Sequence, residues 1–299
     1  MPTINANGID LAYQVHGDPG HPTMLLIQGL GMPLSGWPVE FVQMVVAQGF
    51  RAILFDNRDI GRSQLFDHVQ MPNAVLQVLK SKLGLRARSV YQLHDMAADA
   101  KCLMDALDIS AAHVVGISMG GMIAQLLAID SPDRVTSLTS IMSTTGNRHL
   151  PGPDKPVERH ILRGPGKKAS RERRLDYQMR LWSLIGSPDF PTQEDRRREW
   201  LLGNMERGLT ADGITRQMLA IIASPDRTDK LRNLAVPTLV LHGDADPLVP
   251  VECGHATAMA IPDADMMTIP GMGHDLPEVL QPRIIARIAG HARKAADVK

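Results

Sequence analysis

The sequence predicts an α/β fold with a mostly parallel central sheet, helices on both faces and a helical cap insertion. In the first and last parts of the 299 residues, apolar runs of strand length alternate with runs of helical periodicity, as in parallel sheets whose strands are joined by helices. Between these parts, residues 144–232 lack strand-like runs and are dominated by helical patterns. We therefore expect a core of residues 1–143 and 233–299, with residues 144–232 as the cap.

The N-terminal part predicts a hairpin followed by a βαβ unit. Residues 3–16 alternate around an Asn-Gly dipeptide suited to a two-residue turn. The apolar runs 23–27 and 51–55 suit strands that are covered on both faces. The segment 39–48 between them suits a helix that ends at Gly49.

A charged loop, 56–63, follows and leads into two helical patterns. The loop carries more charge than a connection needs, and the preferred interpretation is structural, with Asp56 and Arg58 tying the loop to its neighbours. A short helix near 74–83 is expected to have a basic exposed face. A longer helix over 92–107 has its apolar residues on one stripe.

The chain is organised around the stretch 114–122. A β-branched run there ends in a Gly-x-Ser-x-Gly turn centred on Ser118, and a helix-favouring run follows. Such a turn holds the serine in a strained backbone conformation, so Gly116 and Gly120 supply the small side chains it needs. The hydroxyl lies at a helix start, where free N–H groups favour a developing negative charge. Ser118 is therefore the candidate nucleophile, and the alternative is an ordinary serine at a helix start.

The last part of the chain returns to alternating strands and helices. Strands are expected at 134–143, before the cap, and at 238–242 and 265–269 after it. Helices are expected near 251–260 and 277–295.

The predicted cap is rich in Lys and Arg, including the run 196–198. A charge run is more often a solvated face than a patch for an anionic substrate, and we prefer that interpretation. The apolar residues of the segment are expected to form the underside facing the site: Leu175, Met179, Leu181, Trp182, Leu184, Ile185, Trp200, Leu201, Leu202 and Met218.

A base and an acid are expected at the carboxyl ends of the last two strands, where sites form in parallel sheets. A serine hydroxyl needs a base, and histidine is suited to that role. Among the 11 histidines, His274 lies in a glycine-flanked loop, whereas His242 is on a strand and His255 is inside a helix. His274 is therefore the candidate base.

The imidazolium that forms on the base needs a carboxylate to orient it and to stabilise its charge. Asp246 and Asp244 both follow the strand 238–242, and Asp275 is too close in sequence to His274. Asp246 precedes a proline that fixes the direction of the chain, so it is the preferred acid, with Asp244 as a residue that caps the turn.

An oxyanion hole is the remaining part of such a site. Its expected donors are the backbone N–H groups of Met119 and Leu30. The glycines on either side of Leu30 allow the backbone to come close to a substrate, or they simply make a tight turn. The candidate substrate-binding residues are Gly29, Trp37 and Trp182.

Composition and the lack of certain motifs restrict the expected partners, location and cofactors of the protein. The net charge is zero, with 32 basic and 32 acidic residues, so neither a nucleic acid nor an acidic membrane is an expected partner. The first residues lack the pattern of a signal peptide and no run has the apolar length of a membrane span, so a cytoplasmic location is expected. No metal or cofactor motif is found, and the two cysteines form no disulfide framework. A small-molecule ester is the expected partner, and a homodimer is compatible with the sequence.

Three stretches resemble the α/β-hydrolase superfamily and, more narrowly, the aclacinomycin methylesterase group of carboxylic ester hydrolases. They are the segments 55–63, 112–120 and 269–274. The resemblance implies triad roles for Ser118, Asp246 and His274, and oxyanion roles for Leu30 and Met119. One departure is that Gln28-Gly29 replaces the His-Gly pair that many members carry before the oxyanion residue.

The function predicted from these residues is hydrolysis of a carboxylic ester through an acyl-enzyme, with no metal or organic cofactor. A lactonase, a carbon–carbon bond hydrolase, a perhydrolase or an acyltransferase would use the same triad. A ligand-binding protein with a vestigial triad is the alternative from another class.

Overall fold

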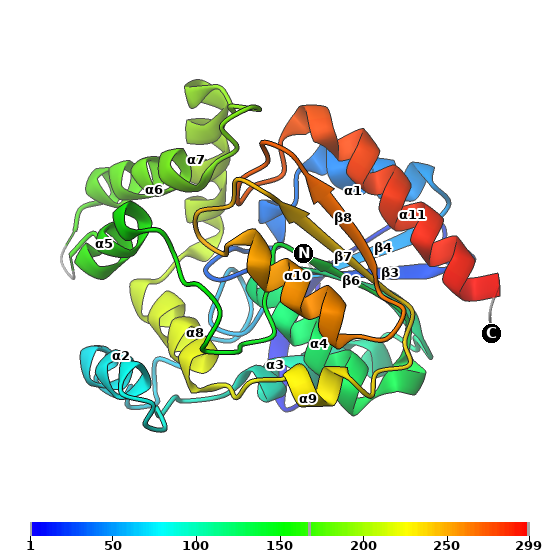
Figure 1. The fold of residues 1–299 in the computed structure, drawn as a ribbon, viewed down its shortest axis with the longest axis horizontal. Coiled ribbons are helices and arrows are strands. Elements are labelled where there is room, and N and C mark those ends of the chain that lie inside the picture. The colour runs from blue at the N-terminus through cyan, green and yellow to red at the C-terminus, as the bar shows by residue number, and fades with distance from the viewer. Residues whose placement is uncertain (1, 167–168, 298–299) are drawn as a thin grey trace.

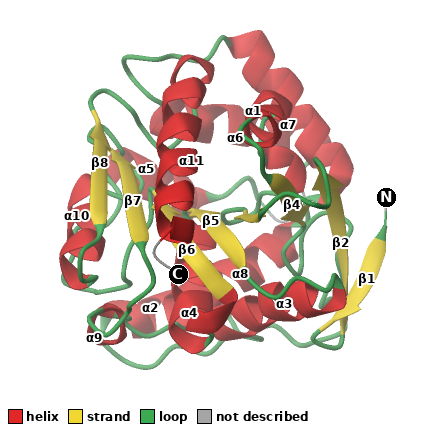
Figure 2. Ribbon diagram, turned by 90° about the vertical axis from the view of Figure 1, so that its right-hand side faces the viewer, coloured by secondary structure: helices red, strands yellow, loops and turns green. Residues whose placement is uncertain are grey.

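The computed structural model describes residues 2–166 and 169–297, and its centre is one eight-stranded sheet of order β1-β2-β4-β3-β5-β6-β7-β8. From β4 to β8 neighbouring strands run parallel, whereas β1 and β2 join the edge antiparallel. The predicted α/β fold is therefore confirmed (Figures 1 and 2). The strands are β1 (Thr3–Ala6), β2 (Ile9–His16), β3 (Thr23–Ile27), β4 (Arg51–Phe55), β5 (Ala112–Ile117), β6 (Val135–Ile141), β7 (Thr238–Gly243) and β8 (Asp265–Ile269).

Eleven α-helices surround the sheet in the part of the chain that the structure describes. They are α1 (Val39–Ala47), α2 (Ala74–Lys82), α3 (Leu93–Ala106), α4 (Met119–Asp130), α5 (Lys155–Arg163), α6 (Arg171–Ile185), α7 (Glu194–Gly208), α8 (Ala211–Ala223), α9 (Thr228–Leu231), α10 (Val251–Ala260) and α11 (Gln281–Asp297). No described helix is long and apolar enough to cross a membrane.

The predicted hairpin is present at the edge of the sheet. Ala6 pairs with Ile9, so the loop between the strands has two residues. Both of these, Asn7 and Gly8, have positive φ angles, 54° and 74°. An Asn-Gly pair adopts this conformation at low cost, which explains why the chain turns here.

The sheet separates two apolar clusters. Successive residues of a strand point to opposite faces, so Leu25 and Ile27 pack with α3 and α4, whereas Met24 and Leu26 pack with α1 and α11. Burial on both faces is what the continuous apolar runs of β3 and β4 predict. The core therefore fixes the sheet edge at which the loops after β3, β5, β7 and β8 lie.

Helices α5 to α8 lie together on the left of Figure 1, between β6 and β7 in sequence. They fall within the predicted cap, 144–232, whereas α9 packs against α4 and α10 of the sheet layer. The division into core and cap remains a prediction, and its ranges include residues 1, 167–168 and 298–299, which lie outside the described residues.

Two buried ion pairs join the charged loop 56–63 to α7 and α8. The Arg207 guanidinium donates to both carboxylate oxygens of Asp56, at 3.0 and 2.7 Å, and Arg216 donates to both oxygens of Asp59, at 2.8 Å each. Both carboxylate side chains have no exposed surface. Removing one partner of such a pair would leave a buried charge without compensation, so the pairs fix α7 and α8 to the loop.

The same loop is joined to α3 by Arg58. Its guanidinium donates to both oxygens of Asp99 at 2.6 Å and lies 5.0 Å from the ring centre of Tyr91. The interpretation of Asp56 and Arg58 as residues that tie the loop to its neighbours is thus confirmed.

Helix α2 differs from its prediction. Its exposed face is apolar rather than basic, because Val75, Leu76 and Leu79 point to solvent while Gln77 is its one buried residue. The sequence periodicity shows that the helix has an apolar face and a polar face, but it does not show which face packs against the protein.

Candidate active site

Ser118 lies between β5 and α4 in the conformation that the motif predicts. Its φ and ψ angles are 55° and −120°, in a region that is rare and strained for any residue other than glycine. A Cβ atom at Gly116 would lie 2.1 Å from the Gly120 oxygen, and one at Gly120 would lie 2.1 Å from the Ile27 oxygen. The requirement for glycine at both positions is therefore a direct steric one.

The structure brings the three predicted triad residues together. The Nδ1 atom of His274 is 2.6 Å from Oδ2 of Asp246, and its Nε2 atom is 3.0 Å from Oγ of Ser118. An ionised carboxylate only accepts hydrogen bonds, so Nδ1 carries the proton and Nε2 is left to accept from the serine hydroxyl. This arrangement can remove a proton from Ser118.

Asp246 is held as an anion behind the imidazole. Burial would raise its pKa, but the neighbouring His274 and the hydrogen bonds made to the carboxylate outweigh burial and keep the pKa well below its usual range. The backbone N–H groups of Leu248 and Val249 both donate to Oδ1 at 2.9 Å. Asp244, the alternative acid, instead accepts from the Gly271 N–H at 2.7 Å and fastens two loops together.

The alternative histidines do not reach Ser118. His242 is fully buried behind Asp246, where Nε2 donates to the Val249 oxygen at 2.7 Å and lies 3.5 Å from Asp246 Oδ2. Its Nδ1 atom has no hydrogen-bond partner among the described residues. His255 is on the exposed side of α10.

The loop that carries His274 is fixed by the end of α6. The His274 N–H donates to the Ile185 oxygen at 2.7 Å, and the Gly273 N–H donates to Ser187 Oγ at 2.8 Å. A Cβ atom at Gly273 would lie 2.6 Å from the Ile185 oxygen, so only glycine permits this approach. Sequence reasoning missed these contacts, because Ser187 carries no motif and lies far from His274 in the chain.

The two predicted oxyanion donors, Met119 and Leu30, directly follow Ser118 and Gly29 in the chain. Gly29 approaches Ser118 so closely that a Cβ atom on it would lie 3.1 Å from the serine Cβ. Among the described residues, the N–H groups of Leu30 and Met119 donate to no protein acceptor. The two predicted donors are therefore left without a protein acceptor, and their oxyanion role remains a prediction.

Three side chains hold the oxyanion loop in place. The side-chain oxygen of Gln28 accepts from the Gly29 N–H at 2.9 Å, which is what the amide does in place of the more common imidazole. Asn57 donates to the Gln28 carbonyl at 3.0 Å. Gln217 of α8 accepts from the Gly31 N–H at 2.9 Å and donates to the Arg58 carbonyl at 2.8 Å. The role of Gln217 was not predicted, since nothing in its own sequence context signals it.

One predicted substrate-binding residue is wrong. Trp37 is 2% exposed and packs in the core against Phe41, with ring centres 5.1 Å apart, so it offers no surface to a substrate. Trp182 lies in α6 and packs edge-on against Trp200, at 4.8 Å, within the cap. A substrate-binding role for Trp182 remains a prediction.

Two arginines of the predicted cap, one of them in the basic run 196–198, form exposed ion pairs. Arg196 pairs with Glu278, and Arg171 of α6 pairs with Glu206 of α7. These contacts fit a solvated face. Among the described residues, no group of three or more His, Cys, Asp or Glu side chains is placed to hold a metal ion.

Comparison with known proteins gives the family. A family model described as alpha/beta hydrolase fold matches residues 22–164, and one described as TAP-like protein matches residues 221–280. Rhodomycin D methylesterase DnrP of Streptomyces peucetius is 30% identical over 99% of this chain and 99% of its own.

Two solved structures share the fold. A meta-cleavage product hydrolase from Pseudomonas fluorescens IP01 has a TM-score of 0.75 at 17% identity, covering 99% of this chain and 98% of that one. A thermophilic esterase from Thermogutta terrifontis has a TM-score of 0.73 at 24% identity, covering 99% of each chain. The shared fold and the identity to the methylesterase over almost the whole length show that this chain belongs to the α/β-hydrolase fold family.

Proposed function

We propose that the protein is a serine hydrolase that cleaves a carboxylic ester through an acyl-enzyme. The observation that carries this proposal is the hydrogen-bonded series from Ser118 through His274 to Asp246, with distances of 3.0 and 2.6 Å. Nucleophile, base and orienting acid at hydrogen-bond distance are the signature of this mechanism.

In the first half of the reaction, Ser118 Oγ attacks the ester carbonyl and its proton moves to His274 Nε2. The negative charge that develops on the carbonyl oxygen is stabilised by the N–H groups of Leu30 and Met119. Asp246 stabilises the imidazolium, because it remains ionised throughout. The imidazolium then protonates the leaving alcohol, and the acyl group stays on Ser118.

In the second half, His274 accepts a proton from water, and the resulting nucleophile attacks the acyl-enzyme. Collapse of the second tetrahedral intermediate releases the carboxylic acid and restores the serine. The same two donors serve both intermediates, since the oxyanion forms at the same carbonyl oxygen.

A methyl ester is the substrate class we favour. The support is the relative named rhodomycin D methylesterase, which is 30% identical over the whole chain. A small alcohol requires little space on the leaving-group side, so a methylesterase should release methanol faster than it releases longer alcohols from the same acid.

The test compares initial rates on p-nitrophenyl esters of increasing acyl length for the wild type, Ser118→Ala and the exposed-serine control Ser110→Ala. We expect Ser118→Ala to lose about four to six orders of magnitude in kcat and the control to lose nothing. If Ser118→Ala hydrolysed the esters at the wild-type rate, the mechanism would be refuted.

A second measurement separates the alternatives that share the triad. If p-nitrophenyl esters are not turned over, labelling by a fluorophosphonate reports whether Ser118 is activated. Labelling without turnover would favour a lactonase, a carbon–carbon bond hydrolase, a perhydrolase or an acyltransferase. Absence of both labelling and turnover would favour a ligand-binding protein.

A further inference from the structure

Helix α2 presents an apolar face to solvent. Val75, Leu76, Leu79 and Leu83 are 80%, 47%, 53% and 66% exposed. With about 100° between successive residues of a helix, these four occupy one continuous arc, and the buried Gln77 lies on the opposite side. The helix thus exposes large apolar side chains while its one buried side chain is polar, and the exposed apolar side chains gain nothing from the folding of this chain alone.

Cations lie along both sides of this apolar arc. On the same helical wheel, Lys80 follows one edge of the arc and Lys82 the other. Lys82 pairs with Glu158 of α5, whereas none of the salt bridges between described residues involves Lys80, Arg86 or Arg88. The segment 74–92 contains no Asp or Glu.

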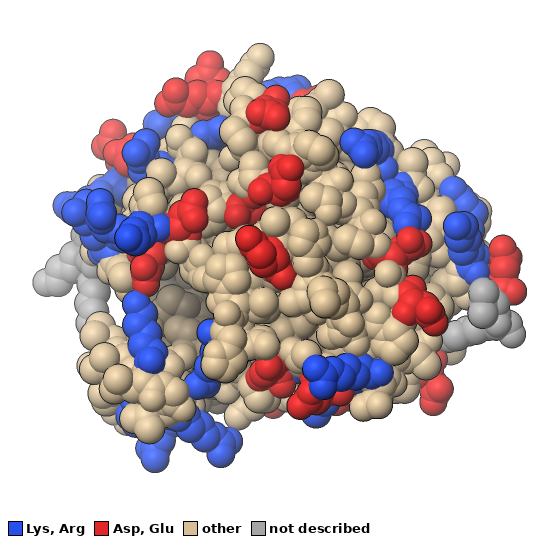
Figure 3. All heavy atoms as spheres, viewed as in Figure 1, with Lys and Arg blue, Asp and Glu red and all other residues tan. Residues whose placement is uncertain are grey.

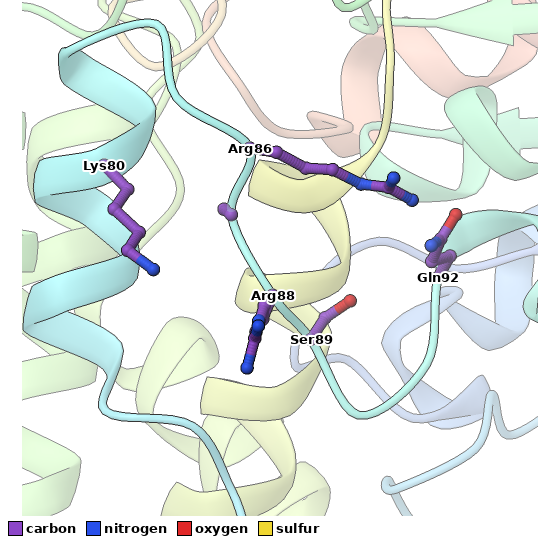
Figure 4. Close-up of a pocket in the computed structure, with 6 residues that line it drawn as sticks. Lys80, Arg86, Arg88, Ser89 and Gln92 are labelled. Atoms are coloured by element: carbon purple, nitrogen blue, oxygen red, sulfur yellow. The ribbon is translucent and has the colours of Figure 1, made fainter.

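A cavity of about 530 Å³ lies beside the helix. It is lined by Lys80, Arg86, Ala87, Arg88, Ser89 and Gln92, so every ionised lining group is a cation (Figure 4). The space-filling view shows an uncharged area over α2, at the lower left, with Lys and Arg along its edge (Figure 3). The exposed side chains of residues 75–88 are called the α2 surface below.

We propose that the α2 surface docks on an anionic lipid bilayer. An exposed helix with large apolar side chains on one arc and lysines at both edges is suited to lie in the plane of a membrane interface. The apolar side chains would enter the acyl boundary, while the flexible stems of the lysines let their charges stay with the headgroups. Arg86 and Arg88 add cationic groups that lipid phosphates would neutralise.

A second copy of the chain fits this surface less well. A symmetric dimer places the same patch of both subunits face to face. Lys80, Arg86 and Arg88 of one subunit would then approach their own copies, and no carboxylate of the segment could compensate them. The zero net charge of the whole chain predicted no membrane partner. A net charge sums over all residues, so it does not reveal this local excess of cations.

Flotation with lipid vesicles tests the proposal. The probes are vesicles of phosphatidylcholine alone and of phosphatidylcholine with about one quarter phosphatidylglycerol. We expect the wild type to partition onto the anionic vesicles and to be released at about 0.5 M NaCl.

Two sets of variants identify the surface. Leu79→Ser with Leu83→Ser should lower the partition coefficient about a hundredfold, since both side chains would lose burial in lipid. Arg86→Ala with Arg88→Ala should lower it about 25-fold, from about fivefold for each cation. Met259→Ser, at an 87% exposed methionine of α10, is the matched control and should bind as the wild type does.

All these side chains are exposed, so each variant should fold and should keep wild-type activity on a soluble ester. Equal partition of the wild type onto both kinds of vesicle would overturn the proposal. The proposal would also be overturned if the wild type did not bind vesicles and instead formed a dimer at higher protein concentration that Leu79→Ser with Leu83→Ser abolishes. Neither readout depends on the proposed esterase activity.

Discussion

Gln217 of α8 offers the sharpest test of how the helices between β6 and β7 act on the candidate catalytic site. This side chain is fully buried on α8, and its two hydrogen bonds join the Gly31 N–H of the oxyanion loop to the Arg58 carbonyl. Gln217→Leu keeps the approximate volume but leaves both backbone groups buried without a partner. At about 1–3 kcal/mol for each of the two groups, the free energy of unfolding should fall by about 2–6 kcal/mol.

The same change should slow catalysis. With the neighbouring amide released, the Leu30 N–H loses its fixed direction, and a full oxyanion donor is worth about 10²–10³ in kcat. We expect Gln217→Leu to lower kcat about 10–100-fold while KM changes less than about threefold, since the donor acts mainly in the transition state.

Gln217→Glu separates the two effects. Its carboxylate still accepts from the Gly31 N–H but cannot donate to the Arg58 carbonyl, so stability should fall while kcat stays close to that of the wild type. Thr215→Ala on the same helix, whose side chain bonds only within the helix, is the control.

The assay combines urea unfolding with rates on a p-nitrophenyl ester at a temperature where all variants are folded. A wild-type kcat in folded Gln217→Leu would refute the inference that the cap residue positions Leu30. Equal losses of kcat in the Leu and Glu variants would show that the effect is one of general destabilisation.

Three further predictions concern the groups around Ser118. Asp246→Asn should lower kcat about 10⁴-fold, and Asp244→Asn much less; the reverse order in rate assays would exchange their roles. Folding lowers the pKa of Asp246, so the stabilising contribution of its carboxylate is present above about pH 4 and is lost as pH falls further. The difference in free energy of unfolding between the wild type and Asp246→Asn should therefore become smaller when unfolding is measured at acid pH. Gly120→Ala places a Cβ atom 2.1 Å from the Ile27 oxygen and should prevent normal folding, whereas Gly203→Ala, with open space around it, should leave the Tm unchanged or raised.

The parts of the site that sequence predicts are those fixed by local geometry. The turn at Ser118 requires glycine on both sides for steric reasons, and those glycines are visible in the sequence. Strands β3, β4 and β8 have the predicted limits, because continuous apolar runs bounded by turn residues define them. His274 and Asp246 follow from their places after strands at one sheet edge.

The parts that sequence does not predict depend on which distant surfaces meet. Gln217 lies 186 residues from the amide it binds. Trp37 follows the Gly-rich loop in sequence, but its ring turns into the core against Phe41 instead of toward the substrate side. An aromatic side chain next to a catalytic loop is compatible with both placements, so its neighbours in space decide between them.

The contacts of α5 to α8 with the rest of the protein differ in what it costs to break them. Moving α7 and α8 away from the sheet would leave Asp56 and Asp59 buried without their guanidinium partners, and breaking a buried pair costs about 3–5 kcal/mol. The contacts of α5 are different, since its ion pair with Lys82 is exposed and is worth about 1 kcal/mol or less.

The end of α6 is fixed, because Ile185 accepts from the N–H of His274. Movement of α5 and the first turns of α6 would break the exposed ion pairs Lys82–Glu158 and Arg171–Glu206. It would also uncover the buried side chains Val157 and Leu175, but it would leave no buried charge without a partner. Movement there leaves both the base loop and the oxyanion loop in place, because Ser187 and Gln217 keep their partners. The catalytic groups can then remain preorganised while the entrance opens.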